Sequence, residues 1–112
     1  MKLTIKSHAN IAVVSIEGSV LQEDIVGFKN ALAEQVEQSL NMIILDMEKT
    51  SYICSLCLAV ILEYKKKLSH LRGDLKIACP NNLITKLLET TRLLEKFDVS
   101  PDIEGAMQRC RG

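Results

Sequence analysis

The 112-residue sequence has no tryptophan and only two phenylalanines and two tyrosines. It therefore offers few of the aromatic side chains on which single-stranded nucleic acids stack. It also carries no net charge, because 14 lysines and arginines balance 14 aspartates and glutamates. A protein that binds nucleic acid through its phosphates normally needs an excess of positive charge. The composition predicts a protein that does not bind nucleic acid.

No apolar run in the sequence is long enough to cross a membrane. The longest, Ile11–Ile16, is interrupted by Ser15 and falls far short of the ~20 residues that a spanning helix needs. Residues 2–6 alternate polar and apolar, unlike the continuous apolar stretch of a signal peptide. These features predict a cytoplasmic protein with no membrane insertion, where cysteines stay mostly reduced. The four cysteines are Cys54, Cys57, Cys79 and Cys110.

The residue patterns of common active sites are also missing. The five glycines are scattered, so no glycine-rich phosphate loop is formed. Neither His8 nor His70 has a sequence context that resembles the general base of a nucleophile, and we interpret both as surface residues. Glu23 and Asp24 precede a predicted helix, whose dipole accounts for paired carboxylates at that position. We therefore expect a protein that is not an enzyme and that binds no cofactor or metal.

Strand patterns predict an α/β fold with a mixed sheet of four to five strands, in one domain spanning residues 1–112. Alternating residues at the N-terminus and the β-branched run Ile11–Glu17, which ends at Gly18, predict two strands. The short turn between them favours antiparallel pairing. The continuously apolar Met42–Leu45 is typical of a central strand covered on both faces. Shorter strands are expected at residues 75–78 and 98–99.

Apolar residues spaced by three and four predict the helices between these strands. One stripe runs from Ile25 to Leu40, with Asp24 at the helix start. Residues 47–53 are expected to form a loop before a second helix, whose stripe ends at Leu71. Gly73 stands where a glycine often terminates a helix.

Two further helices complete the expected order ββαβαβαβα. The third is predicted around residues 84–91. The fourth should have Ser100 as its N-cap and Pro101 at its first position. Its buried stripe is expected to comprise Ile103, Ala106, Met107 and Cys110. Strand–helix–strand units favour parallel pairing with right-handed crossovers, and the N-terminal hairpin makes the sheet mixed.

Two cysteines stand three residues apart at the start of the second helix, in Cys54-Ser55-Leu56-Cys57. A helix N-terminus lowers the pKa of a thiol, so thiol redox chemistry or half of a zinc site is physically feasible. The motif, however, follows the third predicted strand, whereas a thioredoxin-like fold places it after the first, and no second such pair exists to complete a zinc site. We favour two small, partly buried apolar residues and keep a redox or metal-binding protein as an alternative hypothesis.

The order of elements and four segments resemble STAS domains, the family of anti-sigma-factor antagonists, along nearly the whole chain. These segments are Ile16–Gly18, Ile43–Asp46, Tyr52–Ile61 and Thr90–Phe97. The resemblance implies a regulatory module, switched by phosphorylation, that docks a protein partner. In the family this partner is an anti-sigma factor that is also a serine kinase.

The same resemblance indicates where the partner would bind. The family's loop Asp-Ser-Ser-Gly-Leu, whose first serine is phosphorylated, corresponds to Cys54-Ser55-Leu56-Cys57-Leu58. Family members also often carry an acidic residue after the first hairpin, and Leu21 replaces it here. Ser55 is thus the implied phosphorylation site. The implied partner-binding residues are Leu21, Gln22, Ile53, Cys54, Ser55, Leu56, Cys57 and Leu58. Loss of the polar motif leaves an alternative, a non-phosphorylated STAS subunit that acts as a scaffold in a signalling or lipid-transport complex.

Overall fold

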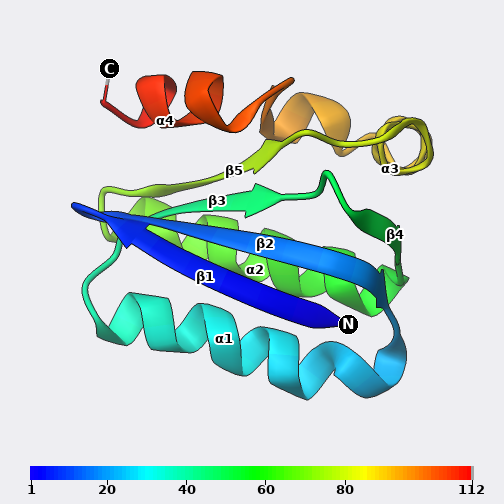
Figure 1. Cartoon of the computed structure of the whole chain (residues 1–112), viewed down its shortest axis with the longest axis horizontal. Helices are drawn as coiled ribbons and strands as arrows, with labels where there is room; N and C mark the ends of the chain where they lie inside the picture. Colours follow the sequence, from blue (N-terminus) through cyan, green and yellow to red (C-terminus); the bar gives the residue numbers. More distant parts are fainter. Residues whose placement is uncertain (112) are drawn as a thin grey trace.

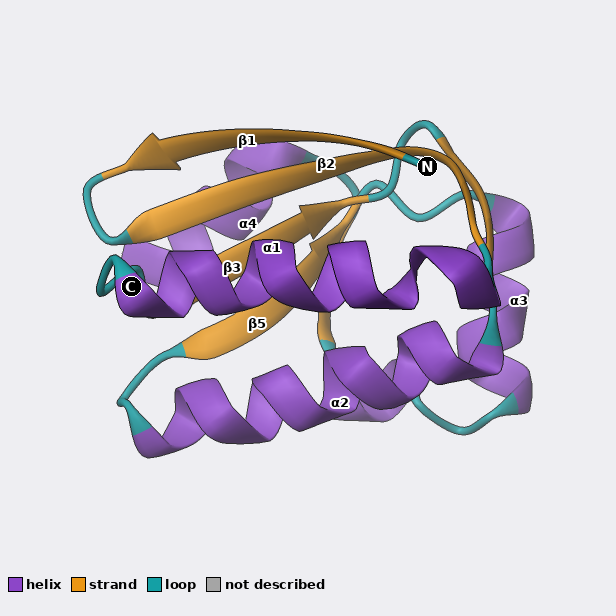
Figure 2. Cartoon of the chain, turned by 90° about the horizontal axis from the view of Figure 1, so that it is seen from below, coloured by secondary structure: helices purple, strands orange, loops and turns teal. Residues whose placement is uncertain are grey.

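A computed structural model of the protein (Figure 1) describes residues 1–111. Six strands form one mixed sheet: β1 (Lys2–His8), β2 (Ile11–Val20), β3 (Met42–Asp46), β4 (Thr50–Ile53), β5 (Asp74–Ala78) and β6 (Asp98–Ser100). The helices are α1 (Ile25–Glu37), α2 (Ser55–His70), α3 (Asn82–Thr90) and α4 (Ile103–Arg111), with single turns η1 (Gln22–Asp24) and η2 (Leu94–Lys96). Helices α1 and α2 cover one face of the sheet and α4 the other (Figures 1 and 2). No helix within this range is long and apolar enough to cross a membrane.

The strand order β1-β2-β3-β5-β6 confirms the predicted mixed α/β fold. β1 pairs antiparallel with β2, from Lys2 opposite Glu17 to His8 opposite Ile11. The remaining neighbours all pair parallel, so β2, β3, β5 and β6 end at the same edge of the sheet. We call this the carboxyl edge. α3 lies there beside β4 (Figure 1), and the Asn81 side chain that caps α3 also donates a hydrogen bond to the carbonyl of Thr50.

The prediction of a loop over residues 47–53 was wrong, because residues 50–53 form β4. This strand pairs parallel with Gly18, Ser19 and Val20, the last three residues of β2, although the second strand was expected to end at Gly18. Gly18 has a φ of +86° and lies where the register shifts, so it redirects β2 and does not terminate it. Thr50 fixes the pair by donating its hydroxyl to the Ile16 carbonyl at 2.8 Å.

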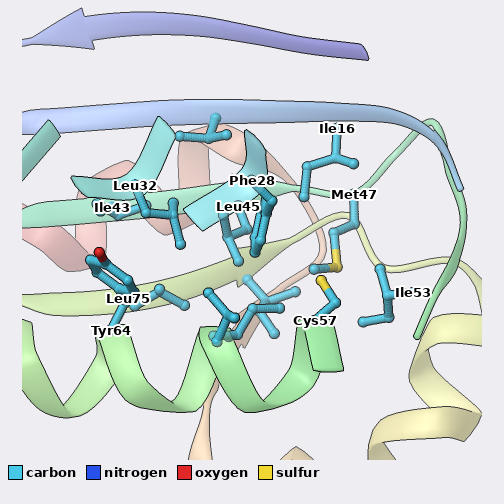
Figure 3. Close-up of a cluster of buried hydrophobic side chains, with 14 of the residues drawn as sticks. Ile16, Phe28, Leu32, Ile43, Leu45, Met47, Ile53, Cys57, Tyr64 and Leu75 are labelled. Atoms are coloured by element: carbon cyan, nitrogen blue, oxygen red, sulfur yellow. The ribbon is translucent and has the colours of Figure 1, made fainter. Parts of the chain in front are cut away.

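The main core lies between the sheet and the pair α1 and α2 (Figure 3). Phe28 and Leu32 of α1 point toward Leu45 of β3, and Tyr64 of α2 lies near Leu75 of β5. All five side chains are at most 2% exposed. The continuous apolar pattern of β3 has the expected cause, since α4 covers its other face.

The C-terminal helix begins later than the sequence indicates. Ser100 is the last residue of β6 and is 2% exposed, so it does not serve as the N-cap. That role falls to Asp102, whose Oδ1 accepts a hydrogen bond from the Gly105 amide at 2.6 Å. The predicted stripe of α4 is confirmed: Ala106 is buried against β3 and β5, and three partly buried side chains pack around it, Ile103, Met107 and Cys110.

Candidate functional site

The predicted partner-binding residues come from two distant segments, and the structure brings these together. Parallel pairing of β2 with β4 sets Val20 opposite Ile53, and the Cys54 amide donates to the Val20 carbonyl at 3.0 Å. Leu21 therefore lies beside the residue that precedes α2. Both segments reach the surface at the carboxyl edge of the sheet, on the right of Figure 1.

Ser55 is exposed and is the first residue of α2. Cys54 is the N-cap, and its side chain accepts no capping hydrogen bond. The first amides of a helix have no intrahelical partner, and the first turn of α2 contains no acidic residue. The Ser55 hydroxyl thus stands at the positive end of a 16-residue helix, a position that tolerates an added negative charge.

Three large apolar side chains surround this helix start and remain exposed to solvent. Leu21 is 41% exposed, Tyr52 42% and Leu56 46%. Leu21 directly follows β2, Tyr52 belongs to β4 and Leu56 to the first turn of α2, and we call these three residues the apolar rim. Exposed apolar groups concentrated on adjacent segments are typical of a protein interaction surface.

Other predicted site residues lie beneath this surface. Ile53 is 1% exposed, Cys57 0% and Leu58 5%, and all three belong to the main core. They hold the helix start in place and present no surface for a partner. Gln22 is exposed and Cys54 half-buried, so a docking role for these two residues, and for Leu21, Ser55 and Leu56, stays a prediction.

The buried position of Cys57 disfavours thiol chemistry. Its sulfur lies near Met47 in the core (Figure 3). Burial, and to a smaller extent the nearby Cys54, raises the pKa of Cys57 to about 12. A thiol with this pKa stays protonated at neutral pH, whereas redox exchange and metal ligation require a thiolate.

The remaining candidate groups form no catalytic constellation with Ser55 in the described residues. His70 is at the opposite end of α2 and His8 at the end of β1, and both are exposed. The Asp24 carboxylate does not cap α1 as expected, because it accepts a hydrogen bond from the Leu21 amide at 2.9 Å. It thereby fixes the backbone of the apolar rim.

Two features were not assigned from the sequence. Tyr52 was expected in a loop, and the signal for its exposure is the pattern of Thr50–Ile53, in which two buried residues flank two exposed ones. A group of possible metal ligands, Asp46, Glu48 and Cys79, lies at the ends of β3 and β5 with one ligand atom from each within 4.8 Å of the others. Its signal in the sequence is the pair of acidic residues at the end of the most apolar strand, Asp46 as the last residue of β3 and Glu48 two residues later.

A mixed sheet with an accessible serine at the start of a helix defines this chain as a small α/β module that presents a helix N-terminus at its surface. A model of the STAS domain matches residues 2–106, and the chain belongs to this family.

Relatives extend the match over nearly the full length of the chain. It is 26% identical over 106 residues to BtrV of Bordetella bronchiseptica, which is assigned as an anti-sigma factor antagonist, with 95% of this chain and 91% of that protein covered. The structure assigned to an anti-sigma factor antagonist of Thermotoga maritima, TM1081, matches with a TM-score of 0.91 at 22% identity, covering 98% of this chain and 95% of that one. The anti-sigma factor antagonist SpoIIAA in its unphosphorylated form matches with a TM-score of 0.87 at 17% identity, covering 99% and 97%.

Proposed function

We propose that this protein is an anti-sigma factor antagonist that docks a kinase-like anti-sigma factor through the apolar rim and the start of α2. The observation that carries the proposal is an exposed serine at a helix N-terminus with three exposed apolar side chains around it. Relatives assigned to this function along nearly the whole chain support it.

The apolar rim provides the binding energy in this proposal. Covering Leu21 and Leu56 with a partner removes apolar surface from water, at roughly 25 cal/mol per Å². The surface is already formed in the free protein, so little ordering opposes association. The partner surface is accordingly apolar at its centre, with polar groups around it.

Leu56→Gln is expected to weaken partner binding about tenfold, because a polar side chain gains less from burial. Leu71→Gln is the matched control, since Leu71 follows α2 at its far end and is 48% exposed, against 46% for Leu56. Binding to purified candidate anti-sigma factors, measured by calorimetry, should drop for the first variant only. Equal affinities for both variants would remove the docking surface from the proposal.

Phosphorylation of Ser55 would act as the switch. A phosphate adds roughly −1.5 to −2 charges, which the amides at the start of α2 tolerate within the free protein. The same charge beneath a docked apolar partner is desolvated and repelled, so the complex dissociates while the fold is unchanged.

Ser55→Glu should therefore weaken partner binding at least tenfold and leave the melting temperature nearly unaltered. Ser55→Gln, of similar size but neutral, should bind far more tightly than the glutamate variant. Affinity and thermal unfolding of both variants provide the test. A glutamate variant that binds as well as the parent protein rules out the switch.

A second candidate is a STAS subunit that binds its partner constitutively. It is favoured by the apolar side chains at Leu21, Cys54 and Leu56, where family members carry polar or acidic residues. Incubation with the cognate kinase and ATP, followed by intact mass measurement, distinguishes the two. A gain of about 80 Da, lost in Ser55→Ala, supports the switch, and an unchanged mass with a stable complex supports the constitutive subunit.

A further inference from the structure

Helix α4 covers only half of its face of the sheet. It packs on β3, β5 and β6, and leaves β1 and part of β2 open (Figure 1). Between the open strands and α4 is a groove with a volume of about 620 Å³. This volume is within the range of small-molecule binding sites, roughly 300–1,000 Å³. The groove faces away from α2 and is separate from the surface around Ser55.

The groove has an apolar middle and charged ends. Val13 on its floor and Ile103 and Met107 on its α4 wall are the apolar part. Lys6 and His8, two residues apart on β1, line it on the side of the β1–β2 turn. Neither Lys6 nor His8 takes part in an ion pair in the described chain.

The end of the groove at the carboxyl edge is acidic. Asp46, Glu48 and Glu17 line it, against the single cation Lys49. None of the four forms an ion pair with another described residue. Negative charge is concentrated there, and a cationic group placed between the carboxylates would relieve their repulsion.

Asp46 is held in a fixed orientation. The Ser15 hydroxyl donates to Oδ2 at 2.9 Å, and the Glu48 amide donates to Oδ1 at 3.1 Å. Oxygen atoms of Asp46 and Glu48 lie within 4.8 Å of each other. This acidic end opens into the apolar middle of the groove, and Lys6 and His8 line the groove's other end. An elongated organic cation that also carries a negative group matches this arrangement of charges, whereas a bare metal ion would contact only the acidic end.

We propose that the groove binds a linear zwitterion of di- or tripeptide size, with its ammonium group at Asp46 and Glu48 and its carboxylate at Lys6 and His8. In the sheet, Lys6 is two strands and two residues from Asp46, which separates their backbones by about 12 Å. The side chains reach inward, and two or three extended residues, at ~3.5 Å each, span what remains. A free amino acid, whose charges are adjacent, is too short.

The test is an NMR titration of the full chain with the tripeptide Gly-Leu-Gly. Its N-acetyl and C-amide derivatives are titrated separately. Amide shifts should concentrate in β1, β2 and α4, and each blocked derivative should bind about tenfold more weakly, because it loses one charge-assisted hydrogen bond. Asp46→Asn should weaken binding of the free peptide and leave the N-acetyl peptide unaffected. Lys66→Gln, on the exposed side of α2, is the matched control and should bind as the parent does.

The proposal is overturned if millimolar peptide causes no shifts, or if blocked and free peptides bind equally. Saturation of the acidic end by Zn²⁺ or Mg²⁺ alone, with no effect of peptide, would also overturn it and assign a metal site. Glu48→Gln, an exposed position, repeats the test if Asp46→Asn fails to fold. None of these results depends on the partner proposed for the surface around Ser55.

Discussion

Gly73→Ala is expected to destabilise the protein by roughly 3 kcal/mol, at the upper end of what overpacking costs. A Cβ at this position would lie 1.8 Å from the Asn41 carbonyl oxygen and 2.7 Å from its carbonyl carbon. Both are backbone atoms, so no side-chain rotation relieves the clash. The loop that precedes β5 would have to separate from the loop that precedes β3.

That separation would break several hydrogen bonds at the amino ends of β3 and β5. The Asp74 amide donates to the Asn41 carbonyl at 3.2 Å, and the Asn41 side chain donates to the Leu71 carbonyl at 3.4 Å. Urea denaturation should show a lower midpoint with little change in slope, because the folded topology persists.

Gly27→Ala is the matched control for this substitution. Gly27 is inside α1, and the only atom near an added Cβ is the flexible Met1 methyl at 3.9 Å. Alanine is favoured over glycine in a helix interior by about 1 kcal/mol, so this variant should be more stable than the parent. A Gly73→Ala protein as stable as the parent would show that the two loops can move apart freely.

Gly73 also shows why a correct sequence signal can have a different physical cause. Glycine was expected there because it often ends a helix, commonly in the left-handed backbone conformation. Here Arg72 adopts that conformation instead, with a φ of +61°. The Gly73 amide closes the helix by donating to the Leu68 carbonyl at 2.8 Å. Its missing side chain is required by Asn41, which is distant in sequence, and helix-capping rules contain no information about such a contact.

Elements whose residue pattern repeats along the sequence were predicted correctly, whereas short segments that depend on tertiary contacts were not. Met42–Leu45 and the stripe of α4 show their burial in the sequence itself. β4 has four residues and exists only because β2 continues past Gly18 to pair with it. The exposure of Tyr52 depends on that pairing, whereas Ser55 could be located through resemblance because its place at a helix start is local.

Ion pairs around Asp98 of β6, which joins Lys76 of β5 to Arg109 of α4, should make the protein lose stability in acid. Lys76, whose side chain is 9% exposed, donates to Asp98 Oδ2 at 2.7 Å and lies 3.5 Å from Asp74. Burial acts to raise the pKa of Asp98, but hydrogen bonds from Lys76 and from Arg109 of α4 outweigh it and hold the pKa below its usual value. The pKa of Asp74 is lowered in the same way by Lys65, the Leu75 amide and Lys76.

A carboxyl group whose pKa is lower in the folded state stabilises the protein fully above its unfolded pKa, about 3.9. That stabilisation is lost as the pH falls through the folded pKa.

Asp98→Asn should therefore lower stability at pH 7 by about 2 kcal/mol, less than for a fully buried pair, because Asp74 still faces Lys76. The same variant should lose less stability than the parent when the pH is then lowered below 4. Urea unfolding at pH 7, 5 and 3 measures both effects, with Glu104→Gln on the exposed side of α4 as the control. A variant with the parent's full acid sensitivity would show that Asp98 is not the group whose protonation weakens the contact between α4 and the sheet.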